Sequence, residues 1–235
     1  MIDIHNHLLY GIDDGSRNID ESIDVLKDLE SVGFTDIILT PHYISGSKYN
    51  NSASKNYRLL RTLKEKVKEN NININLYLGN EVFIDEDIME LIEKSEIYPL
   101  NGSNYLLVEL PLSGEYDGYV EIFSDLIDKG CNVVLAHPER YLSFQKDYNK
   151  IIELEKIGVL FQANFGSLLG KYGDGAKKLI RRLLKEKKLA FLATDIHHKK
   201  HDLRDFDRAK KQALKYINEY EFNILVNRNP SLLLN

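Results

Sequence analysis

Several features are scarce or missing in this chain. Its single cysteine, Cys131, excludes an internal disulfide and a zinc site built from several cysteines. The formal net charge is −5, whereas a protein held to nucleic acid by phosphate contacts needs a basic face. No apolar run approaches the roughly 18 residues of a membrane span, and the first residues lack a signal-peptide pattern. These absences predict a soluble protein of a reducing cytoplasm, with no nucleic-acid partner and no insertion into membranes.

The chain does have a regular alternation of strand-like and helix-like segments. At 235 residues and 43% hydrophobic composition, it can form one α/β barrel with a substantial core. The strand-like segments are short apolar runs, as is typical of parallel strands covered on both faces. We expect strands that end near residues 7, 40, 78, 110, 136, 163 and 193, and helices over 19–32, 55–69, 86–94, 119–129, 150–157, 176–187 and 203–220. Because no linker separates these units, residues 1–235 are expected to form a single domain, either a barrel or a strongly curved parallel sheet.

Side chains that bind metals follow almost every expected strand. In a parallel barrel the carboxyl ends of the strands meet at one face, where active sites are built. Each such residue alone could be a turn former, a loop residue or a solvated strand end, so the argument depends on their convergence. The candidate ligands are five histidines and four acidic residues: His5, His7, Asp14, His42, Glu81, Glu109, His137, Asp195 and His197.

The number and type of these donors indicate more than one metal ion. Nine ligands are too many for one ion and suit two or three. Nitrogen and oxygen donors without thiolate favour manganese, iron or zinc over calcium or magnesium. Three divalent ions would outweigh the four carboxylates by two positive charges, and Arg140 would add another, so the site would attract a phosphate dianion. Multi-metal sites of this kind support phosphoryl displacement by water.

Short motifs that contain these residues occur in the same order as in a known family. The motifs are His5-Asn-His7, Thr40-Pro41-His42, Gly79-Asn-Glu81, His137-Pro-Glu-Arg140 and Thr194-Asp195-Ile-His197. Supporting segments are Asp13-Asp14-Gly15, Leu107-Val-Glu109 and the stretch from Gln162 to Ser167-Leu-Leu-Gly170. With them the chain resembles the polymerase and histidinol phosphatase (PHP) superfamily, and within it the CpsB/YwqE group of bacterial protein-tyrosine phosphatases.

The resemblance implies a distorted (βα)7 TIM-like barrel with three divalent ions, typically manganese. The implied ligand sets are His5, His7 and Asp195 with Glu81 shared; Glu81, Glu109 and His137; and Asp14, His42 and His197. Arg140 would hold the phosphoryl group. Arg204 is the nearest candidate for a second family arginine, although it lies further after Asp195 than in the usual pattern. The implied substrate is the phosphotyrosine tail of a bacterial tyrosine kinase that controls capsule or exopolysaccharide synthesis.

Two alternatives remain open at this point. One is a phosphatase for a small phosphate monoester such as histidinol phosphate, and the other is a non-catalytic metal-binding module that docks on a partner. A cysteine-based phosphatase is disfavoured, because the residue six positions after Cys131 is His137 and not the arginine that a phosphate-binding loop needs. Residues 43–54, which are polar and contain Gly, Ser and Asn, are expected to form a loop of undetermined role. The oligomeric state is also open, a homo-oligomer included.

Overall fold

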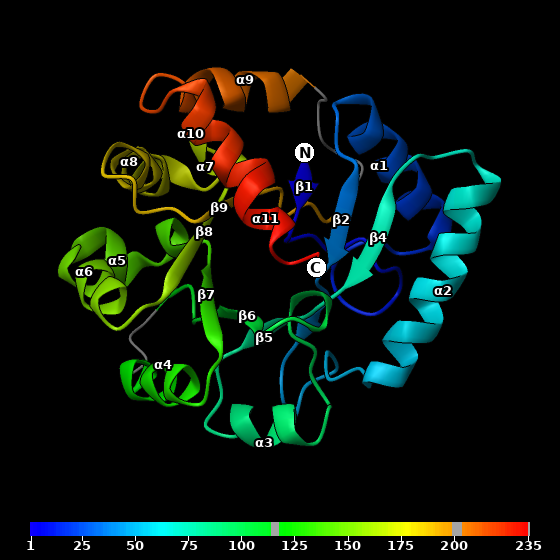
Figure 1. Cartoon of the computed structure of the whole chain (residues 1–235), viewed down its shortest axis with the longest axis horizontal. Helices are drawn as coiled ribbons and strands as arrows, with labels where there is room; N and C mark the ends of the chain where they lie inside the picture. Colours follow the sequence, from blue (N-terminus) through cyan, green and yellow to red (C-terminus); the bar gives the residue numbers. More distant parts are fainter. Residues whose placement is uncertain (114–117, 199–203, 235) are drawn as a thin grey trace.

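Short parallel strands form the centre of the computed structural model, which describes residues 1–113, 118–198 and 204–234, and helices surround them (Figure 1). The strands are β1 Ile2–Asp3, β2 Asp36–Leu39, β3 His42–Tyr43, β4 Asn75–Leu78, β5 Glu81–Phe83, β6 Tyr105–Glu109, β7 Asn132–Ala136, β8 Leu160–Asn164 and β9 Phe191–Ala193. They pair in the orders β1-β2-β4 and β3-β5-β6-β7-β8-β9, with every pair parallel. β3 prolongs β2 beyond Pro41, and β5 prolongs β4 beyond Gly79 and Asn80, so the two sheets occupy seven strand positions. The expected distorted seven-unit barrel is confirmed.

Hydrogen bonds between the segments that follow β9 and β1 close the barrel. The backbone N–H of Asp195 donates to the carbonyl of His5 at 2.9 Å, and the N–H of His7 donates to the carbonyl of Ile196 at 2.9 Å. Below them the buried carboxylate of Asp3 accepts from the backbone N–H and the hydroxyl of Thr194, at 2.9 and 2.7 Å. Burial raises the pKa of Asp3 to about 6, against the lowering effect of these hydrogen bonds. Residues from opposite ends of the chain are thereby fixed side by side.

Apolar side chains fill the lower half of the barrel interior, towards the amino ends of the strands. We call this group the apolar plug: Ile2, Ile4, Ile38, Leu100, Leu107, Val134, Ala136, Phe191, Ala193 and Leu233. Leu233 comes from the C-terminal segment, whose backbone carbonyl at this residue accepts a hydrogen bond from Asn101 Nδ2 at 3.0 Å. Both ends of the chain lie at this side of the barrel, beside β1 (Figure 1).

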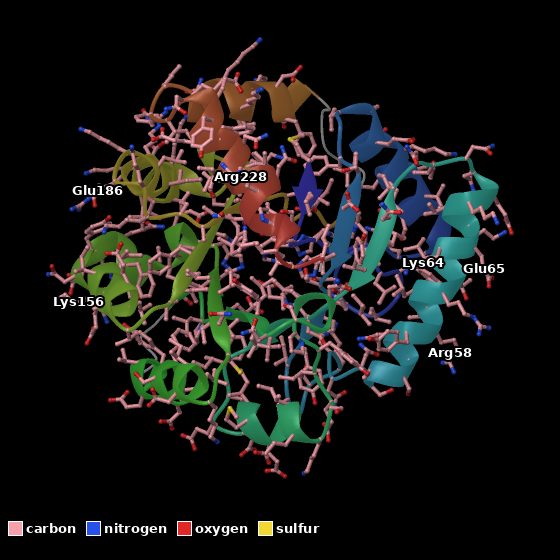
Figure 2. The ribbon with its side chains drawn as sticks, in the orientation of Figure 1. Arg58, Lys64, Glu65, Lys156, Glu186 and Arg228 are labelled. Atoms are coloured by element: carbon pink, nitrogen blue, oxygen red, sulfur yellow. The ribbon has the colours of Figure 1, made fainter. Side chains whose placement is uncertain are left out.

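Amphipathic helices cover the outside of the strands. They are α1 Ile19–Ser31, α2 Ala53–Glu69, α3 Ile88–Glu93, α4 Tyr119–Asp128, α5 Leu142–Lys146, α6 Asn149–Lys156, α7 Phe165–Leu169, α8 Gly173–Lys185, α9 Arg204–Ala213, α10 Glu219–Asn223 and α11 Asn229–Ser231. On α2, Leu63 is fully buried, whereas Arg58 and Lys64 point into solvent (Figure 2). No helix in the described parts of the chain combines the length and apolar character that crossing a membrane requires.

The structure differs from the expected elements in three places. β1 ends at Asp3, so the prediction that His5 and His7 lie on a strand is wrong. The long helix expected over 203–220 is also wrong: α9 ends at Ala213, and Asn218 starts α10 with a reciprocal capping box. The expected loop over 43–54 begins with β3 and ends in the first turn of α2. All three differences concern the ends of elements, and the starts of α2 and α10 are set by local caps at Ser52 and Asn218.

Candidate metal centre

All nine predicted ligands lie together at the carboxyl ends of the strands. Their donor atoms form four overlapping groups, and within each group the atoms lie within 4.8 Å of one another. The groups are His7, Asp14, His42 and His197; His5, His7 and Glu81; His5, His137 and Asp195; and His42, Glu81 and Glu109. The division of these residues among individual ions stays a prediction.

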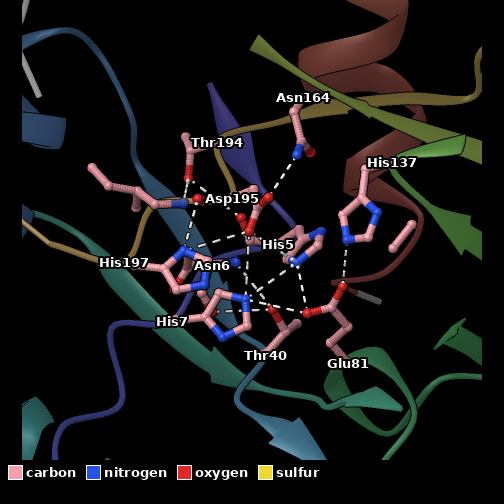
Figure 3. A network of polar contacts seen from close by, with 12 residues as sticks. His5, Asn6, His7, Thr40, Glu81, His137, Asn164, Thr194, Asp195 and His197 are labelled. Atoms are coloured by element: carbon pink, nitrogen blue, oxygen red, sulfur yellow. Dashed lines mark hydrogen bonds and ion pairs between the residues drawn. The ribbon is translucent and has the colours of Figure 1, made fainter. Parts of the chain in front are cut away.

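Glu81, the first residue of β5, lies at the centre of the cluster and contacts four of its histidines (Figure 3). Its Oε2 lies 3.2 Å from the Nε2 atoms of both His5 and His7, and 3.1 Å from His42 Nδ1. Its Oε1 lies 2.9 Å from His137 Nε2. A carboxylate with two oxygens directed at different imidazoles has the geometry of a ligand shared between two cations.

Two ring nitrogens of the cluster lie close to each other and to the same carboxylates. Nε2 of His5 and Nε2 of His7 lie 3.4 Å apart, and each lies 3.5 Å from Asp195 Oδ1. In both rings the other nitrogen is already engaged, since His5 Nδ1 lies 2.7 Å from Gln162 Oε1 and His7 Nδ1 lies 2.8 Å from Asp13 Oδ2. An outer partner on Nδ1 is how proteins orient a histidine that binds a metal through Nε2. The residues therefore fit a divalent cation.

The loop after the first strand packs closely over His7. Asp13 uses both carboxylate oxygens, accepting from the backbone N–H groups of Gly15 and His42 at 2.9 and 3.1 Å while it holds the His7 ring. A Cβ at Gly15 would lie 1.9 Å from the carbonyl oxygen of His7, so only glycine allows this approach. Asp14, whose side chain is 52% exposed, then reaches the outer side of the cluster, with Oδ1 3.5 Å from His42 Nε2.

The outer histidine, His197, is held in one orientation by its own turn. Its Nδ1 donates to the backbone carbonyl of Asp195 at 3.1 Å, so that Nε2 faces Asp14 Oδ1 at 3.6 Å. Burial, reinforced by the charge of His7, lowers the pKa of His197 to about 4. The ring is therefore neutral near pH 7, with a lone pair directed at Asp14 and the solvent.

Two ligands have a left-handed backbone conformation: φ is 35° at His137 and 49° at Asp195. Residues other than glycine rarely adopt positive φ, and such strain is concentrated at functional sites. His137 directly follows β7, and Asp195 lies two residues after the end of β9, so both strained positions are at the carboxyl ends of strands.

The electrostatic environment of the cluster favours bound cations. Burial alone would lower the pKa of His5, but attraction from Glu81 and Asp195 outweighs it and raises this pKa to about 9. The same balance, with Asp13 as the main partner, raises the pKa of His7. Conversely, burial would raise the pKa of Glu81, but the surrounding histidines hold it well below its ordinary value. Buried carboxylates thus set a negative potential that protons or metal ions must balance.

Of the two arginines predicted to bind phosphate, the structure brings one to the site. Arg140 Nη1 donates to Asp195 Oδ2 at 2.8 Å, and its guanidinium lies 4.4 Å from the centre of the Tyr172 ring. This ion pair with Asp195 raises the pKa of Arg140 despite its burial. Arg204 is the first residue of α9, and its side chain lies outside the described part of the structure. Its role as a second phosphate-binding arginine stays a prediction.

Several residues that support the site were not singled out as functional from the sequence. Asp13 and Gln162 occur in the quoted motifs but had no assigned role, and Asn164 and Tyr172 were not selected. A detectable signal was present for two of them. Gln162 and Asn164 are amides inside a short strand that should be apolar if it is covered on both faces. Tyr172 offered no comparable signal, because its contact with Arg140 depends on the path of the chain between β8 and α8.

The fold and the site together define a class, the parallel α/β barrels that bind metal ions at the carboxyl ends of their strands. The family model described as "Capsular polysaccharide synthesis, CpsB/CapC" matches residues 1–235, and the chain belongs to this family. CapC of Staphylococcus aureus is 37% identical over 84% of this chain and 77% of its own length. Tyrosine-protein phosphatase YwqE of Bacillus subtilis is 31% identical over 100% of this chain and 91% of its own length.

Solved structures agree with this assignment. One chain, from crystal structures of YwqE from Bacillus subtilis and CpsB from Streptococcus pneumoniae described as unique metal-dependent tyrosine phosphatases, superposes with a TM-score of 0.91 and 29% identity. The superposition covers 100% of this chain and 94% of that chain. Histidinol phosphate phosphatase of Lactococcus lactis superposes with a TM-score of 0.63 over 92% of this chain and 93% of its own. At 17% identity, that likeness concerns the fold alone.

Proposed function

We propose that this chain is a metal-dependent protein-tyrosine phosphatase, a phosphoric monoester hydrolase that acts on the phosphotyrosine tail of a bacterial tyrosine kinase in capsule or exopolysaccharide synthesis. The observation that carries the proposal is the meeting of nine imidazole and carboxylate ligands at one face, with Arg140 beside them. The names of YwqE and CpsB as tyrosine-protein phosphatases support the reaction, and the name of the family supports the link to capsule synthesis. Three divalent ions, manganese first and iron or zinc next, suit the donor set, and a single cysteine suits the cytoplasm.

Bound divalent ions would supply Lewis acidity for the phosphoryl oxygens and would lower the pKa of a water molecule. The chain's own contribution is to hold these charges in place. Glu81 and Asp195 are almost fully buried and cannot move without losing several partners. Their fixed positions mean that little reorganisation is needed when charge develops during the reaction.

Arg140 is placed to bind the phosphoryl group. One of its five N–H donors is engaged by Asp195 Oδ2, and the face of the guanidinium packs on Tyr172. With its orientation fixed in this way, the guanidinium presents further donors at the edge of the cluster. A phenol leaving group has a pKa of about 10, so it needs less help from a general acid than an alkyl alcohol does.

The proposal is tested by measuring hydrolysis of a phosphotyrosine peptide before and after removal of metal with a chelator. Activity should vanish on chelation and return when Mn²⁺ is added back, whereas undiminished activity after chelation would rule the function out. Arg140→Lys keeps the charge but loses the planar fork, and it should lower kcat/KM by about 10²-fold if Arg140 contacts the phosphoryl group. Arg58→Lys on the exposed face of α2 is the matched control and should leave kcat/KM unchanged.

The same assay separates the two alternatives. Histidinol phosphate hydrolysed faster than the phosphotyrosine peptide would identify a small-molecule phosphatase on the same fold. A phosphopeptide that binds but is not hydrolysed by metal-loaded protein would identify a non-catalytic module.

A further inference from the structure

Strand β8 differs from the other strand positions of the barrel, since none of the nine predicted ligands follows it. The inward-facing residues of β8 change from Leu160, which packs on the apolar plug, to Gln162 and Asn164 at the level of the metal centre. Both amides are completely buried. Buried amide groups cost free energy unless they are fully hydrogen-bonded, so their partners indicate their purpose.

The two amides form a continuous hydrogen-bonded chain between two predicted ligands. Asn164 Nδ2 donates to Asp195 Oδ2 at 2.6 Å (Figure 3), and Gln162 Nε2 donates to Asn164 Oδ1 at 2.8 Å. Gln162 Oε1 lies 2.7 Å from His5 Nδ1. The chain therefore runs from a carboxylate on one side of the centre to an imidazole on the other.

The chemistry of its ends fixes the direction of every hydrogen bond in this chain. A carboxylate only accepts, so the amide nitrogen of Asn164 must face Asp195, and the amide oxygen must face Gln162. Gln162 must then donate to Asn164, which leaves its oxygen facing His5. Because an amide oxygen only accepts, the proton of the neutral His5 ring is on Nδ1, and the lone pair is on Nε2.

Hydrogen bonds to a neighbouring turn hold β8 in position. Glu139, fully buried in the turn that also carries His137 and Arg140, accepts from the backbone N–H of Asn164 at 2.9 Å and from Ser167 Oγ at 2.6 Å. The amides are thereby fixed to the same frame as Arg140. Since Arg140 and Asn164 both donate to Asp195 Oδ2, the other oxygen, Oδ1, is left facing His5, His7 and His197.

We propose that Gln162 and Asn164 are positioning residues of the metal centre, which set the tautomer of His5 and select the oxygen of Asp195 that faces the ion. This inference rests on the metal-binding part of the proposed function and not on the identity of the substrate. It also gives a role to the motif segment that begins at Gln162, for which the sequence suggested none. Loss of an outer partner of a metal ligand typically weakens metal binding by about 10- to 100-fold.

The test compares metal binding and not activity. Gln162→Met and Asn164→Leu keep the approximate shape of the side chains but remove the hydrogen bonds. We expect each to weaken binding of Zn²⁺, measured by competition with a chromogenic chelator, by about 10- to 100-fold at one site. The double variant should be little worse than either single variant, because both changes break the same chain. Additive losses, or wild-type affinity in both single variants, would overturn the inference.

A matched control lies at the opposite end of β9. Asn229 is also an amide, and its Nδ2 donates to the backbone carbonyl of Ala190 at 2.9 Å, far from the metal centre. Asn229→Leu should lower the unfolding temperature without changing Zn²⁺ affinity. An equal loss of affinity in this variant would show that general destabilisation, and not the amide chain, weakens the site.

Two further measurements keep the test decisive if a variant folds poorly. In wild-type protein loaded with diamagnetic Zn²⁺, long-range ¹H–¹⁵N NMR correlations should place the His5 proton on Nδ1, and a proton on Nε2 would refute the inference without any variant. Gln162→Glu keeps an oxygen opposite His5 Nδ1 and should recover most of the affinity lost in Gln162→Met; no recovery would contradict the inference. Wild-type protein that binds no Zn²⁺ would instead refute the metal centre itself.

Discussion

The two halves of the barrel interior are made of the same strands but stabilised in opposite ways. In the lower half, aliphatic side chains such as Ile38, Val134 and Leu233 fill the space and contribute by burial of apolar surface. In the upper half, buried carboxylates and imidazoles occupy the same axis, and burial of such groups costs free energy unless partners compensate. The comparison teaches that the apolar plug contributes stability, whereas the ligand cluster at the carboxyl ends of the strands costs stability and provides the functional groups.

The largest effect that would sharpen this comparison is expected from a change in the upper half. His137→Ala removes an imidazole whose Nε2 lies 2.9 Å from Glu81 Oε1. The kcat for a phosphotyrosine peptide should fall by about 10²–10³-fold, the scale of losing one electrostatic stabiliser of a transition state. Circular dichroism and thermal melting should show a retained fold. An unchanged kcat would place the chemistry elsewhere.

A change in the lower half should give the reverse pattern. Leu233→Ala removes a fully buried side chain of the apolar plug and should lower the free energy of unfolding by about 2–5 kcal/mol. The kcat of the folded protein should stay unchanged, because Leu233 is not among the residues of the candidate ligand groups. Urea unfolding followed by fluorescence of the tyrosines, with activity assayed below the transition, would check both parts. If Leu233→Ala lost activity without losing stability, the proposed separation of stability and activity between the two halves would be wrong.

The smallest expected effect is a release of protons when the upper half binds metal. The pKa of His5 in the metal-free protein is about 9, so this ring is protonated at pH 7, and the pKa of His7 is also raised. An ion needs a neutral ring, so its binding must release at least one proton, and affinity should rise as the pH increases towards 9. Calorimetric titration in buffers of different protonation enthalpy would count the protons released. Binding without proton release at pH 7 would show that the carboxylates do not control the histidines.

The sequence was sufficient to predict the barrel and the meeting of nine candidate ligands in its upper half. Both predictions depend on patterns that are local in the chain: apolar runs of strand length, and a polar residue such as Glu81 or His137 within a few residues after most of them. Because parallel strands bring their carboxyl ends to one face, local signals could be combined into a site before any contact was known. The same logic predicted the place of Arg140.

Features that depend on contacts distant in sequence could not be predicted. The attachment of Asp3 and His5 to the segment around Thr194, about two hundred residues away in the chain, is one such feature. The break between α9 and α10 is a different case, because the capping box of Asn218 and Glu221 that starts α10 is local and can be read in the sequence. The link from Asn164 to Asp195 needed the register of β8 against β9.

The placement of both chain ends beside the apolar plug has a practical consequence. Met1 precedes β1, and Leu233 belongs to the same cluster as Ile2 and Phe191, the first residues of β1 and β9, so a surface tether at either of these segments would be attached near the amino ends of these strands. In immobilised molecules the ligand cluster would then face away from the surface. A large phosphorylated protein could therefore reach it, as a short peptide can.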